Sequence, residues 1–145
     1  MPECSQGCGS RPVRLSYDIP ADLEAIPPIV DEVVELATQH ATPESEAPQA
    51  IALCLQEAIV NAVVHGSKED KQKHVQCWVS LGSNDILMVV RDSGPGFDFT
   101  HPPDALGMEG LGLDHGRGVL LIQQLMDDVH YARNGSELHM MKRLA

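Results

Sequence analysis

Three polar side chains recur one helical turn apart in residues 53–66, LCLQEAIVNAVVHG. Glu57, Asn61 and His65 are four residues apart, so a helix would place them on one stripe. The amide oxygen of Asn61 is a hard ligand suited to Mg²⁺, and the carboxylate of Glu57 can act as a general base. The alternative is that both lie at the solvent edge of an amphipathic helix, and this segment alone leaves the two open. For the lone histidine, His65, we expect packing or capping.

A second motif, DSGPGFD, directly follows the apolar run ILMVVR at residues 86–91. The carboxylate of Asp92, at the end of a strand, can accept a hydrogen bond from an exocyclic amine such as that of adenine. Gly94 and Gly96 remove side chains where the backbone must turn sharply or approach a flat ligand. A plain tight turn explains the same pattern, because D-x-G is common after strands.

Glycines also surround the start of a predicted helix, as GLG at residues 110–112 and GRG at residues 116–118. Backbone N–H groups at a glycine-rich helix N-terminus form a site for anions, most often phosphate. The segment is not a P-loop, because no Gly-Lys-Ser/Thr follows, and not a dinucleotide fingerprint, because no strand precedes it directly. A flexible connector is the alternative interpretation.

Hydrophobic periodicity predicts the elements that must position these motifs. Alternation or a continuous apolar run predicts strands at residues 13–19, 74–81, 86–91, 129–132 and 137–143. The second and third strands should form an antiparallel hairpin, and the last two another around the favoured turn pair Asn134-Gly135.

Three helical regions are predicted between these strands. Pro27-Pro28 should separate a short first turn from a helix that runs to about residue 39, and another helix covers residues 117–126. Residues 97–116 show little periodicity, and we interpret this long loop as a mobile lid. The longest helix runs from about residue 46 to 65 with a core-facing stripe of Ile51, Leu55, Ala58, Ile59, Ala62 and Val63.

This order of elements predicts an α+β fold, a two-layer sandwich in which helices cover one face of a mixed, mostly antiparallel sheet. A length of 145 residues is that of one domain, so we expect a single domain over residues 12–145 behind a disordered tail of residues 1–11. Because only 3% of residues are aromatic while 43% are hydrophobic, the core must consist of Val, Ile, Leu, Met and Ala.

The charge balance is 10 basic against 21 acidic residues, a net of −11, which argues against direct binding of nucleic acid or an anionic membrane. No apolar run approaches the roughly 18 residues that span a bilayer. The N-terminus, MPECSQGCGS, lacks an apolar signal segment, so we expect a cytoplasmic protein. Free thiols are expected for the four cysteines, with weak metal binding or redox sensing by Cys4 and Cys8 as the alternative.

In chain order the three motifs read E-x-x-x-N-x-x-x-H-G at 57–66, D-x-G-x-G-F at 92–97 and G-x-G at 116–118. This set resembles the N box and the two glycine boxes of the GHKL ATP-binding fold, also called the Bergerat or HATPase fold. The chain length and the closing stretches GRGVLLIQQLMDDVHY and NGSELHMMKRL further resemble the bacterial anti-sigma factor serine/threonine kinases of the RsbW and SpoIIAB type. The resemblance covers about residues 13–144.

The resemblance implies a role for each matching residue. It implies that Asn61 is a Mg²⁺ ligand, that Glu57 is the catalytic base and that Asp92 reads adenine. The other residues implied to bind ATP are Gly94 and Gly96 beside the adenine, Gly116, Arg117 and Gly118 in the phosphate loop at the end of the lid, and Ser136 near an adenine-side water.

The implied function is that of an ATP- and Mg²⁺-dependent protein serine/threonine kinase acting as an anti-sigma factor. Such a kinase would phosphorylate a serine of an anti-anti-sigma (STAS) partner and sequester a sigma factor, and homodimerisation is implied by the resemblance alone. One alternative is a non-catalytic switch that binds its partners depending on whether ATP or ADP is bound, although the presence of Glu57 favours catalysis. Another is ATP hydrolysis within a larger assembly, which the lack of a transducer domain disfavours.

Overall fold

The computed structural model describes residues 13–68, 70, 72–94 and 113–145, with the backbone alone described for residues 113–117. The predicted tail of residues 1–11, with Cys4 and Cys8, and residues 97–112 of the predicted lid lie outside the described residues. The elements in chain order are β1 (Val13–Pro20), a 3-10 turn (Leu23–Ala25), α1 (Ile26–His40), α2 (Ala47–Asn61), a π-helical turn (Ala62–Gly66), β2 (His74–Leu81), β3 (Asp85–Arg91), α3 (Leu113–Leu125), β4 (Asp128–Ala132), a second 3-10 turn (Arg133–Gly135) and β5 (Glu137–Arg143).

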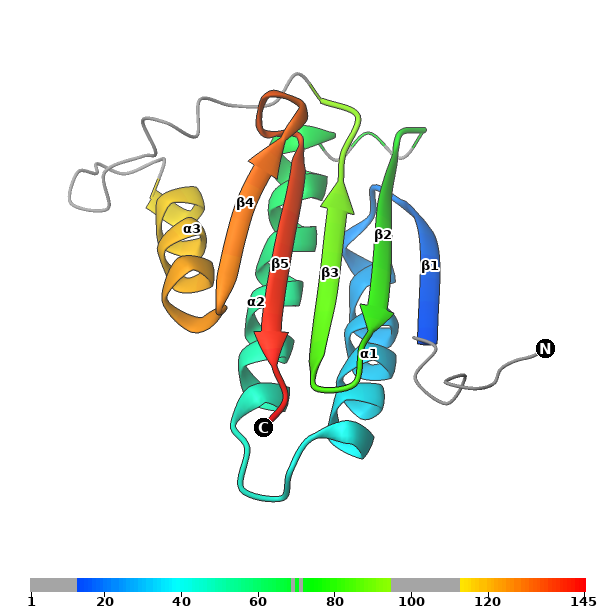
Figure 1. The fold of residues 1–145 in the computed structure, drawn as a ribbon. Helices are drawn as coiled ribbons and strands as arrows, with labels where there is room; N and C mark the ends of the chain where they lie inside the picture. Colours follow the sequence, from blue (N-terminus) through cyan, green and yellow to red (C-terminus); the bar gives the residue numbers. More distant parts are fainter. Residues whose placement is uncertain (1–12, 69, 71, 95–112) are drawn as a thin grey trace.

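The strands form one sheet in the order β1-β2-β3-β5-β4, and each pairing among the described strands is antiparallel. The helices α1 and α2 lie behind this sheet, and α3 lies beside α2 near the β4 edge (Figure 1). The predicted two-layer α+β sandwich is therefore confirmed, and every predicted strand end agrees with the structure to within one residue.

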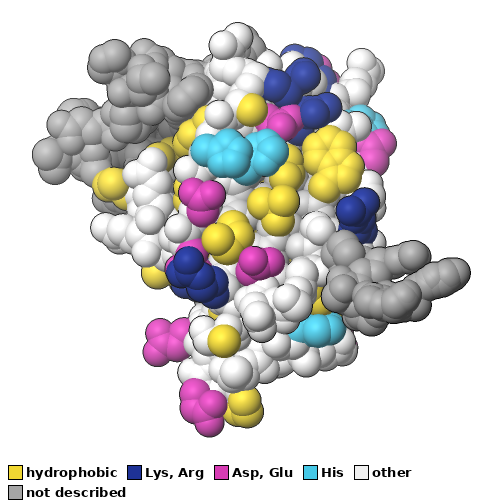
Figure 2. All heavy atoms as spheres, viewed as in Figure 1, with side chains coloured by type: hydrophobic (Ala, Val, Ile, Leu, Met, Phe, Trp, Pro, Cys, Tyr) yellow, Lys and Arg dark blue, Asp and Glu magenta, His cyan; other side chains and the backbone are white. Residues whose placement is uncertain are grey.

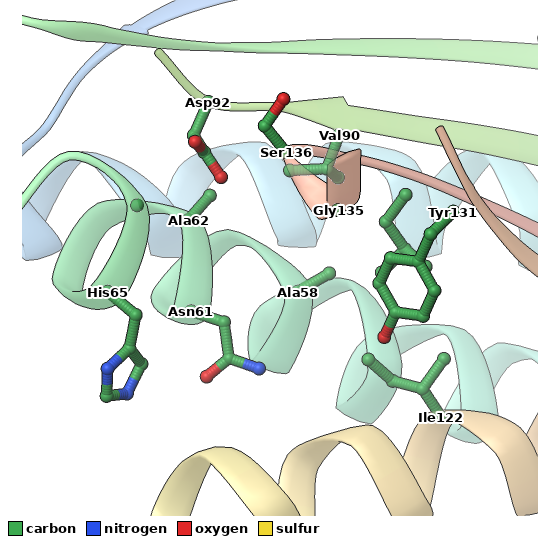
Figure 3. Close-up of a pocket in the computed structure, with 12 residues that line it drawn as sticks. Ala58, Asn61, Ala62, His65, Val90, Asp92, Ile122, Tyr131, Gly135 and Ser136 are labelled. Carbon is green, nitrogen blue, oxygen red and sulfur yellow. The ribbon is translucent and has the colours of Figure 1, made fainter. Parts of the chain in front are cut away.

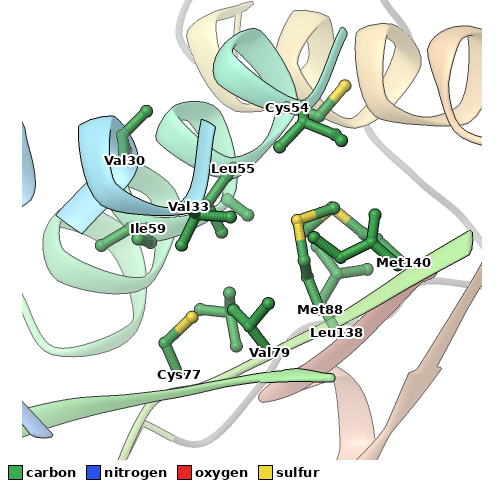
Figure 4. Packing of buried hydrophobic residues seen from close by; sticks show 14 of the residues in the cluster. Val30, Val33, Cys54, Leu55, Ile59, Cys77, Val79, Met88, Leu138 and Met140 are labelled. Carbon is green, nitrogen blue, oxygen red and sulfur yellow. The ribbon is translucent and has the colours of Figure 1, made fainter. Parts of the chain in front are cut away.

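The core fills the space between the sheet and α2. Alternate residues of β2, from Val75 to Leu81, face the helices and are buried. All six residues of the predicted α2 stripe are at most 5% exposed, as the helical spacing predicts. Met88 and Met140 lie close together on neighbouring strands beneath Leu55 and Cys54 (Figure 4). Flexible methionines thus take space that aromatic rings occupy in many cores.

The continuous helical segment Ala47–Gly66 is long and apolar enough to cross a membrane by length and composition, with a mean hydropathy of 1.4. Its position explains the composition, because it is the central helix against the sheet. Ile51, Leu55 and Ile59 are 0% exposed inside the domain, where their apolar side chains pack on other residues of the core.

Two helix boundaries differ from the predictions. Pro27 and Pro28 lie inside the first turn of α1, whose N–H groups need no helical partner, so they start the helix where a break was expected. α3 begins at Leu113, four residues before the predicted start, so the last four residues of the predicted lid are helical. Glycine lowers helix propensity by about 1 kcal/mol, which is why Gly116 favoured the loop over the helix.

Candidate functional site

A cavity of about 260 Å³ lies between the end of α2, the adjoining ends of β3 and β5, β4 and α3. Asp92 and Ser136 approach it from the strand ends, Asn61 and His65 project from the helix, and Tyr131 lies at the far side (Figure 3). The described residues that line it are Ala58, Asn61, Ala62, His65, Gly66, Val90, Asp92, Ile122, Tyr131, Gly135, Ser136 and Leu138.

The helix changes its hydrogen bonding where it reaches this cavity. After Asn61 the chain continues as a π-helical turn, closed by the Ser67 N–H, which donates to the Ala62 carbonyl at 2.8 Å. Such π turns interrupt a regular helix and occur frequently at functional sites. His65 and Gly66, both in this turn, line the cavity, and His65 is exposed. Of the two expected roles of His65, its exposure argues against packing in the core, and capping stays a prediction.

Asp92 is half-buried directly after β3. Its N–H donates to the Ser136 carbonyl at 2.9 Å, which holds the end of β3 against the start of β5. Its Oδ1 accepts the Gly94 N–H at 2.7 Å. Burial raises the pKa of this carboxyl, and the Gly94 N–H offsets part of that rise. A carboxylate has about four acceptor positions, so Asp92 can accept a further donor from a ligand in the cavity.

Two glycines allow a close approach of the backbone segments around Asp92. A Cβ on Gly66 would overlap the Asp92 carboxylate, with Oδ1 only 2.6 Å away. A Cβ on Gly94 would overlap the Gly66 carbonyl group, whose carbon would be 2.8 Å away. Gly94 therefore serves the contact between two backbone segments, whereas the sequence suggested a turn or an approach to a flat ligand. Gly96 lies outside the described residues.

Glu57 and Asn61, one turn apart on α2, meet different surroundings. Asn61 lines the cavity, whereas Glu57 packs against Gly118 of α3, where a Cβ would lie 2.7 Å from the Glu57 Cδ. Gly118 is buried in the second turn of α3 and makes room for the Glu57 side chain. The predicted helix already included Arg117 and Gly118, and α3 extends it back past Gly116. The phosphate-binding role implied for these three residues stays a prediction.

Ser136 is 5% exposed and follows a tight turn with left-handed backbone. Arg133, Asn134 and Gly135 have φ of 52°, 58° and 91°, so the predicted Asn134-Gly135 turn is present and the glycine adopts an angle that side chains disfavour. The Ser136 Oγ donates to the Arg133 carbonyl at 2.8 Å. Its lone pairs can still accept a hydrogen bond from a water or ligand.

The apolar side of the cavity was not predicted from the motifs; it is formed by Val90, Ile122, Tyr131 and Leu138. Tyr131 lies opposite Leu138 in the β4–β5 ladder, and burial raises the pKa of its phenol to about 12, so it is neutral at physiological pH. Alternation along the closing hairpin was the available signal, because it places Tyr131 on the same face as Val129, which packs against the core.

A family model, described as the histidine kinase-like ATPase domain, matches residues 19–142 of this chain. The chain belongs to the histidine kinase-like ATPase domain family. The match covers both motif-bearing segments of the cavity, around Asn61 and around Asp92. The family predicted from the three motifs is thereby confirmed.

Two named proteins are similar to this chain at low sequence identity. The chain is 24% identical over 132 residues to a protein named anti-sigma F factor from Bacillus licheniformis, and the aligned region covers 88% of this chain and 80% of that protein. It is 32% identical over 91 residues to the serine-protein kinase RsbW of Bacillus subtilis (strain 168), and this aligned region covers 54% of this chain and 53% of that protein.

Proposed function

We propose that this chain is an ATP-dependent protein serine/threonine kinase that acts as an anti-sigma factor. The observation that carries the proposal is that Asn61, Asp92 and Ser136 line one cavity in a member of this ATPase family. Relatives named anti-sigma F factor and serine-protein kinase support the finer assignment.

The cavity suits the nucleoside end of ATP. Its volume of about 260 Å³ lies just below the range of about 300–1,000 Å³ typical of pockets for whole ligands, so the triphosphate would extend beyond it. The side chains of Val90, Ile122 and Leu138 match the apolar faces of a purine. Asp92 would accept a hydrogen bond from the exocyclic amine of adenine, and the neutral Ser136 hydroxyl would complete the polar edge.

Asn61 would hold Mg²⁺ through its side-chain oxygen. Among the described residues no group of three His, Cys, Asp or Glu side chains could bind a metal by itself. That fits Mg²⁺, which keeps several waters and takes few protein ligands when it binds with a nucleotide. When bound, the ion neutralises phosphate charge, which a chain of net charge −11 cannot do alone.

In phosphoryl transfer, the hydroxyl oxygen of a partner serine would form a bond to the γ-phosphorus as the bond to the leaving ADP oxygen breaks. Glu57 would take the proton of that hydroxyl. In the structure Glu57 packs against Gly118 and is not among the described residues that line the cavity. This observation favours the second candidate function, a switch that binds partners according to its nucleotide without transferring phosphate.

Incubation with Mg-[γ-³²P]ATP and STAS proteins distinguishes the two functions. For a kinase, we expect label on a partner serine that disappears with Glu57→Ala while ATP binding persists. Glu35→Gln, which neutralises an exposed carboxylate on α1, is the matched control and should leave transfer unchanged. ATP binding with no transfer to any STAS protein would support the switch instead.

We further propose a sigma factor and a STAS protein as cytoplasmic partners, without direct contact to nucleic acid or a membrane. The acidic charge of the chain and the relatives named anti-sigma F factor support this assignment. In size-exclusion chromatography with light scattering, the ATP-bound protein should elute as a homodimer in complex with a sigma factor. Addition of the STAS partner should release the sigma factor from this complex. Failure of every sigma factor to co-elute would contradict the anti-sigma role.

A further inference from the structure

A connected set of polar side chains crosses the sheet face that the helices leave open. Glu137 accepts the Arg91 Nε–H at 2.7 Å through one oxygen and the His139 Nε2–H at 2.6 Å through the other. We call these three residues the carboxylate bridge. Histidine, charged and hydrophobic side chains gather on this open face (Figure 2).

The carboxylate bridge is fixed on both sides. The ring of His130 stacks on His139 with centroids 4.5 Å apart, and the Arg91 guanidinium lies 5.0 Å from the Trp78 ring. Glu137 is only 8% exposed. Burial disfavours its charged form, but the hydrogen bonds from His139 and Arg91 outweigh burial and lower its pKa. The buried acid is therefore ionised, and its hydrogen bond with Arg91 links β5 to β3, while its bond with His139 lies within β5.

The bridge lies one residue from the two polar groups at the proposed adenine end of the cavity. Arg91 and Glu137 are direct partners in the β3–β5 ladder. Asp92 directly follows Arg91, and Ser136 directly precedes Glu137. The Asp92 N–H donates to the Ser136 carbonyl at 2.9 Å. A change in the spacing of the two strands at Arg91 would therefore move Asp92 relative to Ser136.

We infer that Glu137 is a positioning residue for base recognition: by bridging Arg91 and His139 on the open face, it holds Asp92 in register with Ser136 at the cavity. The inference rests on the proposed nucleotide site. A carboxylate accepts from both partners and carries the charge that pairs with Arg91, whereas a neutral glutamine has one acceptor oxygen and an NH₂ group that pairs with His139 Nε2 only in the other ring tautomer. Glu137→Gln therefore weakens the bond to Arg91, because it removes one of the two charges of that pair.

Base selectivity tests this role more directly than affinity. ATP carries the exocyclic amine that Asp92 would bind, and inosine triphosphate carries a carbonyl oxygen in its place. Calorimetric titration of the full chain with each Mg-nucleotide gives an ATP-over-ITP affinity ratio. We expect Glu137→Gln to lower this ratio by about three- to tenfold, part of the contribution of a hydrogen bond to a charged group.

A general loss of stability would lower both affinities together and leave the ratio unchanged. Arg91→Gln, at a side chain 35% exposed, removes the other end of the bridge and should lower the ratio in the same way if Glu137→Gln fails to fold. The control is Asp18→Asn, which breaks the exposed 3.0 Å pair with His74 on the β1–β2 edge and should keep the wild-type ratio.

A wild-type ratio near one would refute base reading by Asp92, and with it the proposed nucleotide site. A high wild-type ratio that Glu137→Gln and Arg91→Gln both preserve would overturn the positioning role alone. An equal fall with Asp18→Asn would also overturn it, because the effect would then belong to the whole sheet.

Discussion

Replacement of Gly66 by alanine should displace the residue that reads the base while leaving the fold intact. Three atoms of the Asp92 carboxyl group surround the position of the new Cβ, and the farthest, Oδ1, is 2.6 Å away. Ordinary van der Waals contact begins at 3.4 Å, so Oδ1 must retreat by about 0.8 Å. The backbone of Gly66 lies in a helical turn without a positive φ, so alanine fits the backbone itself.

A retreat of about 0.8 Å lengthens a hydrogen bond of about 2.9 Å beyond 3.6 Å, at which it no longer counts as one. A hydrogen bond to a charged group contributes about 1.5–3 kcal/mol. Its loss corresponds to an affinity for ATP about 10- to 150-fold weaker, since about 1.4 kcal/mol is tenfold. Alanine is about 1 kcal/mol better than glycine within a helix, so thermal stability should not fall in parallel.

Titration calorimetry with Mg-ATP measures this loss, and circular dichroism monitors the fold. Gly82→Ala is a matched control, because its Cβ would meet the Asp85 Oδ1 at 2.7 Å in the exposed β2–β3 turn, away from the cavity. It should leave the affinity for ATP unchanged. An unaltered affinity in Gly66→Ala, or an equal loss in both variants, would refute the reasoning.

Further predictions concern the other residues of the site. Asn61→Ala and Asp92→Asn should each abolish ATP binding by calorimetry with an unchanged circular dichroism spectrum, and retained affinity in either would remove that residue's role. Because burial raises the folded-state pKa of Asp92, the contribution of this side chain to stability is present at low pH and is lost as pH rises through that pKa. The melting temperature of the nucleotide-free Asp92→Asn variant should therefore exceed that of the wild type at neutral pH but not in acid. The opposite order of melting temperatures would contradict the burial argument. Gly118→Ala should crowd Glu57 and slow phosphoryl transfer by about 10²-fold, with ATP affinity nearly unchanged; a transfer rate equal to wild type would show that Glu57 is not the base.

Much of the fold could be predicted from the sequence because hydrophobic spacing records which face of each element is buried. The β2 alternation and the α2 stripe both correspond to buried residues in the structure. Where glycine and proline occur, local preference was misleading. Pro27 fits the first turn of α1, and Gly116, predicted to lie in the lid, is inside α3. Gly118 leaves space in α3 for the Glu57 side chain. That contact joins residues far apart in the chain, which no local pattern encodes.

The candidate site also combines residues that the sequence predicts with contacts that it does not. Asn61 and Asp92 were predicted from their motifs and Ser136 from the family resemblance, and all three line the cavity. The π-helical turn that brings Gly66 beside Asp92 was not predicted, because its residues have ordinary helical spacing. The carboxylate bridge could not be predicted either, since it depends on the register that pairs Arg91 with Glu137.

A crystal structure with Mg²⁺ and a non-hydrolysable ATP analogue tests the central claim most directly. We predict that the adenine occupies the cavity, with its exocyclic amine within hydrogen-bonding distance of the Asp92 carboxylate and with Asn61 coordinating the ion. An analogue bound elsewhere, or a cavity left empty at saturating nucleotide, would contradict the account.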